Sequence, residues 1–200
     1  GKPLIAWTIE ASKKSSYISK TLVSSEDEEI LEVSKKYGAE TIKRPSELAK
    51  DDSSSEVVIL HALQELRKNN EEFDYIILLQ PTSPLRKSDD INNAFEKVMT
   101  VNASSLISVS EIDNKILKAF VQTSQGYITG VSNNRFPFMR RQDLPNTYLS
   151  NGAIYIVKVT DFLANQSLLT DKCISFEMNK IKSLDIDNEK DLIEVRKYMK

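Results

Sequence analysis

The chain has 200 residues, a net charge of −2, 40% hydrophobic residues and 28% charged residues. This composition suits one globular domain with a core large enough for an enzyme, and the lack of a long basic run argues against nucleic acid as the main partner. Cys173 is the only cysteine, which excludes an internal disulfide and a thiolate zinc cluster and suits a cytoplasmic location. The longest apolar run, 75–79, is too short to span a membrane, so we expect no membrane partner.

Hydrophobic periodicity switches between the helical and the strand type along most of the chain. The helix at 26–38 is marked most clearly, with acidic residues in its first turn, lysines in its last turn and Gly38 as a stop. Helices are expected at 3–12, 26–38, 56–70, from Ser88 onward as its cap, and at the end of the chain up to Lys200. Strands are expected at 20–25, 39–43, 74–80, 104–110, 153–157, 173–178 and near 181–186.

Alternating strands and helices with short connections predict an α/β fold, with a mostly parallel sheet and helices on both faces. The pattern degrades from about 113 to 150, where Gly, Pro, Asn and the cluster "RFPFMRRQDLP" predict an arm that leaves the sheet. We expect one domain over 1–200. The chain opens with a helix at 3–12, whereas an α/β chain usually begins with a strand, so we expect the natural N-terminus to lie before Gly1.

Polar side chains follow three of the predicted strands. Arg44 follows 39–43, Gln80 opens the segment "QPTSPLR" after 74–80, and Asp185 and Asp187 end the strand near 181–186. If these strands are parallel, their carboxyl ends meet at one edge of the sheet, where ligands bind in such folds. An arginine, an amide and two carboxylates at one edge suggest a phosphorylated ligand with a divalent cation.

The pair Asp185 and Asp187 allows two interpretations. Residues two apart in a strand point to the same side, and a bound Mg²⁺ would turn the repulsion of their carboxylates into attraction. Alternatively, Asp187 or Asn188 caps the final helix and Asp185 is exposed. Spacing alone is compatible with both interpretations, and Asp187 could bind the metal and cap the helix at the same time.

The other candidates also have ordinary structural interpretations. Arg44 precedes a proline and suits a surface turn, and "QPTSPLR" either ends a strand or forms a stiff binding loop. The Asn-Gly pair at 151–152 is a strong hairpin signal, which makes a ligand contact by Asn151 the weaker interpretation. Arg141 and the arginine before it form a solvated pair, or an anion clamp if the arm folds back.

Four segments together resemble the acylneuraminate cytidylyltransferases, in the family's order: "RPSELAKDDSSS", "LLQPTSPLR", "RRQDLPNTYLSNGAIYI" and "SLDIDNEKDL". The resemblance covers nearly the whole chain. It implies a Rossmann-like nucleotidyltransferase fold and a homodimer whose protruding arm reaches the neighbour's site. It also implies CTP and a nonulosonic acid (sialic acid or a relative) as substrates, Mg²⁺ as cofactor, and a CMP-sugar and pyrophosphate as products.

The resemblance further implies a role for each matching residue. Cytidine would be bound by Arg44, Ser53 and Ser55, the sugar or its phosphate neighbour by Gln80, Arg141, Asn151 and Tyr155, and the metal by the catalytic pair Asp185 and Asp187. The chain departs from the family twice. The family's first strand and its basic phosphate-binding loop are missing, and Leu149 stands where some sialic acid enzymes have arginine, so legionaminic or pseudaminic acid could replace sialic acid.

Two other functions are compatible with parts of the sequence. An Asp-x-Asp after a strand also suits a metal-dependent glycosyltransferase that uses a nucleotide-sugar, although "QPTSPLR" and "RRQDLP" argue against it. A chain without the basic loop could instead be a nucleotide-binding subunit that does not turn over.

Overall fold

The structure, a computed structural model, describes residues 1–50 and 53–199. Positions 51–52, in the polar loop predicted at 44–55, and position 200, at the end of the last predicted helix, lie outside the described residues. The helices are α1 (Leu4–Lys13), α2 (Glu28–Lys36), α3 (Ser55–Lys68), α4 (Ser88–Val101), α5 (Val159–Asn165) and α6 (Glu189–Arg196). The strands are β1 (Leu22–Ser25), β2 (Glu40–Lys43), β3 (Tyr75–Leu78), β4 (Ser105–Ile112), β5 (Phe120–Gln122), β6 (Ile128–Gly130), β7 (Thr147–Lys158) and β8 (Cys173–Glu177). Short 3₁₀ helices occupy Ser46–Leu48, Asn114–Lys118, Phe136–Phe138 and Arg141–Asp143.

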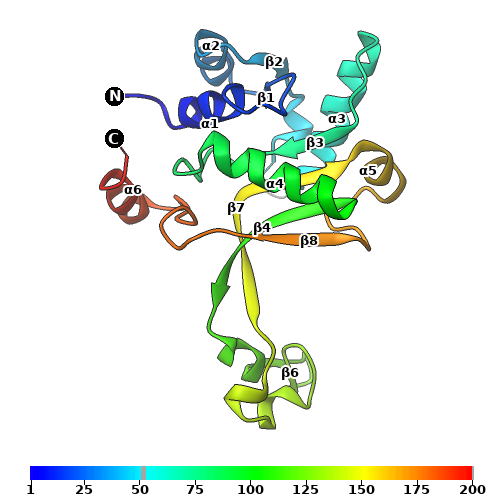
Figure 1. Cartoon of the computed structure of the whole chain (residues 1–200), viewed down its shortest axis with the longest axis vertical. Helices are drawn as coiled ribbons and strands as arrows, with labels where there is room; N and C mark the ends of the chain where they lie inside the picture. Colours follow the sequence, from blue (N-terminus) through cyan, green and yellow to red (C-terminus); the bar gives the residue numbers. More distant parts are fainter. Residues whose placement is uncertain (51–52, 200) are drawn as a thin grey trace.

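Within the described residues, the central sheet has four strands in the order β3-β7-β4-β8 (Figure 1). β7 pairs antiparallel with both β3 and β4, whereas β4 and β8 pair in parallel. The prediction of a mostly parallel sheet is therefore wrong for this sheet, and the fold is α/β with a mixed sheet. The reason lies in the connection: β7 returns from the arm directly beside β4, and an antiparallel neighbour needs no helical crossover.

β1, α2 and β2 form a separate β-α-β unit. The two strands pair in parallel from Leu22 opposite Glu40 to Ser25 opposite Lys43. The Asp27 side chain accepts hydrogen bonds from the backbone N–H groups at the start of α2, and Gly38, with φ +84°, ends the turn after the helix. The sequence predicted this unit correctly, because each signal that defines it is local.

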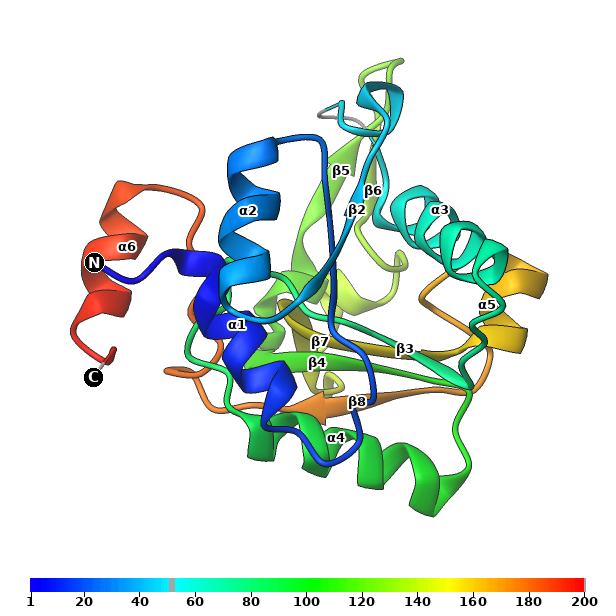
Figure 2. The same cartoon turned by 90° about the horizontal axis from the view of Figure 1, so that it is seen from above.

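Helices cover both faces of the central sheet, as Figure 2 shows from above. On one face, α4 and α1 pack against β4 and β7 through a core of aliphatic side chains, among them Ile91, Val98, Leu106, Ile154 and Ile156. On the other face, α3 and α5 pack against β7 through a smaller core made of Ile59, Val157, Phe162 and Leu168. The prediction of helices on both faces is confirmed, and this two-sided core fixes the sheet that carries the site.

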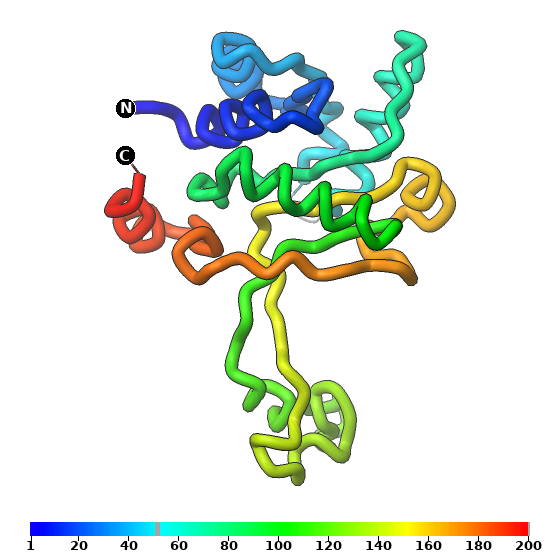
Figure 3. Tube along the Cα trace, in the orientation of Figure 1, coloured from blue at the N-terminus to red at the C-terminus, as the bar shows by residue number. Residues whose placement is uncertain are grey.

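Residues 113–146 leave the sheet between β4 and β7 and project away from it, at the bottom of Figure 1. This arm contains the antiparallel ribbon β5–β6, with Phe120 opposite Gly130. Phe120 and Phe138 meet edge to face at 6.5 Å between ring centroids, yet Phe138 remains 83% exposed. The first helix, α1, and the last helix, α6, lie in the part of the molecule away from the arm (Figure 3).

Two local predictions are wrong. Residues 181–186 do not form a strand: 181–183 form turns, in which Ser183 N and Leu184 N donate to backbone oxygens only three or four positions earlier, and 184–186 are irregular. The Asn179 side chain stabilises these turns by accepting from Lys182 N at 2.9 Å. Ser88 does not cap α4 but is its first residue, and the preceding residue occupies the N-cap position. In the described part of the chain, no helix is long and apolar enough to cross a membrane.

Candidate active site

A glycine inside β7 shapes the centre of the site. The Asn-Gly pair at 151–152 does not form the hairpin turn that the sequence predicted; it lies within β7, where the register against β4 shifts. Gly152 has φ +72°, a conformation that favours glycine. A Cβ at this position would clash with Gln80 Oε1 and lie 3.2 Å from Ser83 Oγ. The irregular strand therefore lets the "QPTSPLR" segment lie directly on β7.

Asn151, next to this glycine, is buried and joins three segments. Its Oδ1 accepts hydrogen bonds from Ser108 Oγ of β4 at 2.6 Å and from Ala153 N at 3.2 Å. Its Nδ2 donates to Ser183 Oγ at 2.9 Å. Among the described residues, these bonds fill both acceptor positions of Oδ1 and use one of the two Nδ2 protons. The sugar contact assigned to Asn151 by resemblance stays a prediction.

Ser83 connects the "QPTSPLR" segment to the predicted metal ligands. This fully buried serine places its hydroxyl 3.1 Å from Asn151 O and 3.4 Å from Asp185 Oδ1. A backbone hydrogen bond of 3.0 Å from Ile186 N to Thr82 O holds the two segments together. Asp185 thus reaches the end of β3 as the sequence suggested, but through a loop contact and not as the end of a parallel strand.

The carboxylate of Asp187 does not cap the final helix. Asn188 is the N-cap residue, and its Oδ1 accepts from Lys190 N at 2.9 Å and from Asp191 N at 3.2 Å. Asp191 Oδ2 in turn accepts from the backbone N–H groups of Asp187 and Asn188, each at 3.1 Å. The cap interpretation is therefore confirmed for Asn188 and wrong for Asp187, whose exposed carboxylate is left for another partner.

The donor chemistry of Asp185 and Asp187 fits a hard divalent cation. Among the ion pairs within residues 1–50 and 53–199, none uses either carboxylate. The described residues contain no group of three or more His, Cys, Asp or Glu side chains that could hold a metal by themselves. Mg²⁺ needs no such group, since it is commonly bound by one or two carboxylates together with waters and substrate phosphates.

The predicted cytidine-binding residues lie in and after the loop that follows β2. Arg44 N donates to Ser25 O at 2.8 Å, and its Nη2 lies 2.6 Å from Glu26 Oε2. This hydrogen bond lowers the pKa of the Glu26 carboxyl. Ser53 is half-buried, and Ser55 is the first residue of α3. In the part of the chain that the structure describes, no strand pairing joins β1–β2 to the central sheet, so the predicted shared edge does not follow from pairing.

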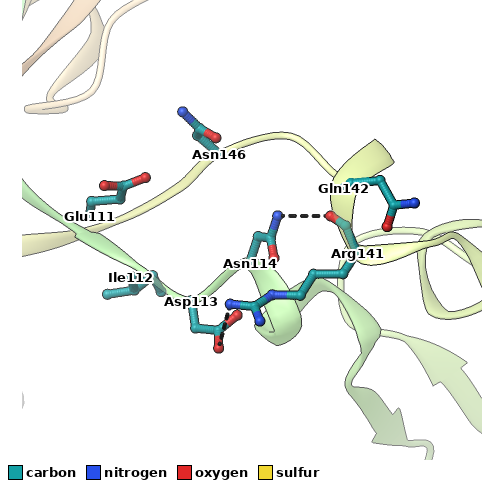
Figure 4. Close-up of a pocket in the computed structure, with 7 residues that line it drawn as sticks. All are labelled: Glu111, Ile112, Asp113, Asn114, Arg141, Gln142 and Asn146. Atoms are coloured by element: carbon teal, nitrogen blue, oxygen red, sulfur yellow. Dashed lines mark hydrogen bonds and ion pairs between the residues drawn. The ribbon is translucent and has the colours of Figure 1, made fainter.

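Arg141 lies at the base of the arm, beside a hollow of about 380 Å³ (Figure 4). Its Nη2 is 3.4 Å from Asp113 Oδ2, and its backbone oxygen accepts from Asn114 Nδ2 at 3.2 Å. The hollow is lined by Glu111, Ile112, Asp113, Asn114, Arg141, Gln142 and Asn146. Within the described residues, no hydrogen bond or ion pair joins Arg141 to Asp185 or to Ser83, which contacts Asp185.

Tyr155 lies further along β7, opposite Leu78 of β3 and Ile107 of β4. It is half-buried and packs against the core under α3 and α5. Its assigned place in the sugar pocket stays a prediction.

The model of the family described as Cytidylyltransferase matches residues 1–198 of the chain. The chain belongs to this cytidylyltransferase family. The match confirms the resemblance drawn from the four sequence segments and replaces the glycosyltransferase alternative.

Curated relatives of this cytidylyltransferase act on several sugar acids, according to their names. The pseudaminic acid cytidylyltransferase of Campylobacter jejuni is 30% identical over 193 residues, which are 96% of this chain and 83% of that protein. The CMP-N,N'-diacetyllegionaminic acid synthase of Legionella pneumophila is 34% identical, over 100% of this chain and 86% of that protein. The N-acylneuraminate cytidylyltransferase of Streptococcus agalactiae is 32% identical over 98% of this chain, but this chain spans only 46% of its length.

Solved structures show the same fold at low identity. A CMP:2-keto-3-deoxy-manno-octonic acid synthetase, in complex with CTP, matches with a TM-score of 0.67 at 16% identity and covers 100% of this chain and 88% of its own. The 4-diphosphocytidyl-2C-methyl-D-erythritol synthase of Anaerococcus prevotii matches with a TM-score of 0.65 at 11% identity, over 99% and 86% of the two chains.

Sequence reasoning missed several small polar residues of this cytidylyltransferase. Ser83, Ser108 and Ser183 connect the predicted ligands to one another; Ser83 was expected only as part of the "QPTSPLR" loop, and the other two were not expected at the site. Ser108 carries a usable signal: a serine within the apolar strand "SLISVS" must find a partner once it is buried, and here it bonds to Asn151 Oδ1 and to Ile154 N.

Proposed function

We propose that this cytidylyltransferase transfers the cytidylyl group of CTP to a nonulosonic acid, with Mg²⁺ held by Asp185 and Asp187. The observation that carries the proposal is the contact between the "QPTSPLR" segment and Asp185, in which Ser83 Oγ lies 3.4 Å from Asp185 Oδ1. It brings the residue proposed to meet the sugar, Gln80, and the proposed metal ligands to one end of the sheet. Relatives named for pseudaminic, legionaminic and N-acylneuraminic acids support the substrate class.

The anomeric hydroxyl oxygen of the sugar acid would form a bond to the α-phosphorus of CTP. The bond between that phosphorus and the oxygen bridging to the β-phosphate breaks, pyrophosphate leaves, and the hydroxyl proton passes to water. A bound Mg²⁺ supplies charge neutralisation at the phosphate oxygens. The chain contributes orientation: Gln80 and Asn151 present amide groups to the sugar acid, and Asp185 and Asp187 supply oxygen ligands for the cation.

The cytidine would be held by the segment after β2. Among the residues that the structure describes, the buried Nε of Arg44 has no hydrogen-bond partner, and Ser53 and Ser55 lie close in sequence to it. A guanidinium with a spare donor suits a nucleotide oxygen.

We further propose a homodimer in which the arm carries Arg141 toward the neighbour's sugar site. Arg141 has 61% of its side chain exposed, and among the described residues its guanidinium contacts only Asp113, at 3.4 Å, so its donors are largely available. Tyr155 would line the sugar pocket. The reaction uses no nucleic acid or membrane, and the lone Cys173 supports a cytoplasmic location.

The direct test is product formation. The protein is incubated with CTP and Mg²⁺ and with sialic, legionaminic or pseudaminic acid in turn, and the mixtures are searched for the CMP-sugar by mass spectrometry. We expect a CMP-sugar from at least one acid. If CTP binds in calorimetry but no acid gives a product, the non-catalytic alternative is correct and the proposal fails.

A further inference from the structure

Arg86, the last residue of "QPTSPLR", holds three segments together from inside the protein. It is only 2% exposed. Its Nη1 lies 2.7 Å from Ala153 O of β7 and 3.3 Å from Gln80 O, and its Nη2 lies 2.7 Å from Thr8 Oγ1 of α1. One guanidinium therefore connects its own loop, the central strand and the first helix.

The charge of Arg86 is not balanced by a contacting carboxylate. Within residues 1–50 and 53–199 it forms no ion pair, and its buried Nε has no hydrogen-bond partner. Burial lowers the pKa of the guanidinium to about 10, against a smaller opposite effect of the Asp90 charge, so it stays protonated at neutral pH. Burying such a charge is costly, and a structural bond between neutral groups would hold the loop at less cost. The forked donor geometry of arginine is what a neutral side chain cannot replace.

The two carbonyl groups that Arg86 contacts belong to the proposed sugar contact and to the strand next to it. One belongs to Gln80 itself. The other belongs to Ala153, directly after Gly152, the glycine on which the Gln80 side chain rests. The same guanidinium thus fixes both the backbone of Gln80 and the strand segment beneath its carboxamide.

We propose that Arg86 is a positioning residue for the sugar acid, which it serves by locking the Gln80 backbone to β7 and so setting the place of the Gln80 carboxamide. This inference rests on the proposed function, because it takes Gln80 as a sugar contact. Arg86 itself touches no substrate in this account, since it is buried beneath the segment that does.

Arg86→Lys tests the proposal against the matched control Thr8→Val. Lysine keeps the charge, but its side chain is one bond shorter, so its Nζ does not reach the place of Nη1 between the two carbonyl groups, whereas Thr8→Val removes only the Nη2 bond to α1. For Arg86→Lys we expect the KM for the sugar acid to rise about tenfold, which corresponds to the loss of one charge-assisted hydrogen bond, with an unchanged KM for CTP. For Thr8→Val we expect both KM values to stay unchanged. An unchanged sugar KM in Arg86→Lys, or equal changes in both variants, would overturn the proposal.

A second measurement needs no substrate and separates this inference from the proposed function. Amide hydrogen exchange is compared over 80–86 and 151–154, and Arg86→Lys should exchange faster in both segments, while Thr8→Val should not. If this difference is found in a protein that makes no CMP-sugar, Arg86 does hold the Gln80 backbone to β7, and the proposed function fails. If exchange is unchanged in Arg86→Lys, the role of Arg86 in holding these segments is refuted. If Arg86→Lys does not fold, NMR of the wild-type protein with ¹⁵N-labelled arginine replaces this test. Separate Nη proton signals for Arg86 support a guanidinium fixed by its hydrogen bonds, and one averaged signal overturns the proposal.

Discussion

Ser83 Oγ lies 3.4 Å from Asp185 Oδ1, although the two residues are 102 positions apart in the sequence. Ser83 belongs to the loop after β3, and Asp185 belongs to the irregular segment between β8 and α6. The hydroxyl also lies 3.1 Å from Asn151 O of β7, so one buried serine meets all three segments of the proposed site. The sheet itself does not bring Asp185 there; side-chain and loop contacts do.

Asp187→Asn should lower turnover strongly without unfolding the protein. The carboxylate is exposed and forms no hydrogen bond within the described residues, so its loss costs little stability, while a cation ligand is lost. We expect kcat to fall by about 100-fold, the scale seen when one group that stabilises developing charge is removed. The matched control is Asn188→Ala, which removes the cap of α6 and should cost about 1 kcal/mol while leaving kcat unchanged. Full activity of Asp187→Asn with a lowered Tm would refute the metal assignment.

Gly152→Ala should disturb the Gln80 side chain as well as the backbone. At φ +72° an alanine costs about 1 to 2 kcal/mol, and its Cβ would clash with Gln80 Oε1. Gly126→Ala is the control, because Gly126 has φ +86° but open space around it. We expect urea unfolding to show a similar loss in the free energy of unfolding for the two variants. We expect a raised KM for the sugar acid in Gly152→Ala alone. A raised KM in both would show that strain, and not the contact with Gln80, is responsible.

Ser108→Ala should destabilise the fold more than a typical serine substitution. The Ser108 hydroxyl is fully buried, donates to Asn151 Oδ1 at 2.6 Å and accepts from Ile154 N at 2.7 Å. Its removal leaves a buried N–H without a partner, which costs about 1 to 3 kcal/mol. Ser110→Ala on the same strand is the control. Chemical denaturation should show the larger loss for Ser108→Ala, and equal losses would mean that the bonds to Asn151 and Ile154 contribute nothing.

The sequence was sufficient to predict those elements of the fold whose signals are local. The β1–α2–β2 unit followed from the acidic first turn of α2 and from Gly38, whose φ of +84° the sequence suggested by its place after the helix. The arm followed from the loss of periodicity between 113 and 150.

Features that depend on distant partners were not predictable in this way. A hairpin and a strand irregularity both need the positive φ of Gly152, and only the pairing of β7 with β4 decides between them. The expectation that Asp185 lies near the end of β3 rested on a wrong reason: residues 181–186 form no strand, and the bond from Ile186 N to Thr82 O brings them to the loop after β3. No spacing rule encodes such a contact between loops.

Phe138→Ser should weaken the proposed homodimer. Phe138 is 83% exposed and Tyr127, also on the arm, is 72% exposed, and large exposed apolar side chains on one projection mark a protein-interaction surface. The control is Leu169→Ser, since Leu169 is 65% exposed but lies between α5 and β8, off the arm. Sedimentation should show a shift toward monomer for Phe138→Ser alone. A wild-type protein that is monomeric at all concentrations would contradict the dimer.

Pyrophosphate release by the wild-type protein and by Asp185→Asn, measured side by side with CTP, Mg²⁺ and the preferred sugar acid, tests the central claim most directly. The account predicts release by the wild type that requires both the sugar acid and Mg²⁺, and a rate lower by about 100-fold in Asp185→Asn with an unchanged Tm. Equal rates for the two proteins would contradict the assignment of Asp185 to the metal site, and no release by the wild type with any nonulosonic acid would contradict the proposed function itself.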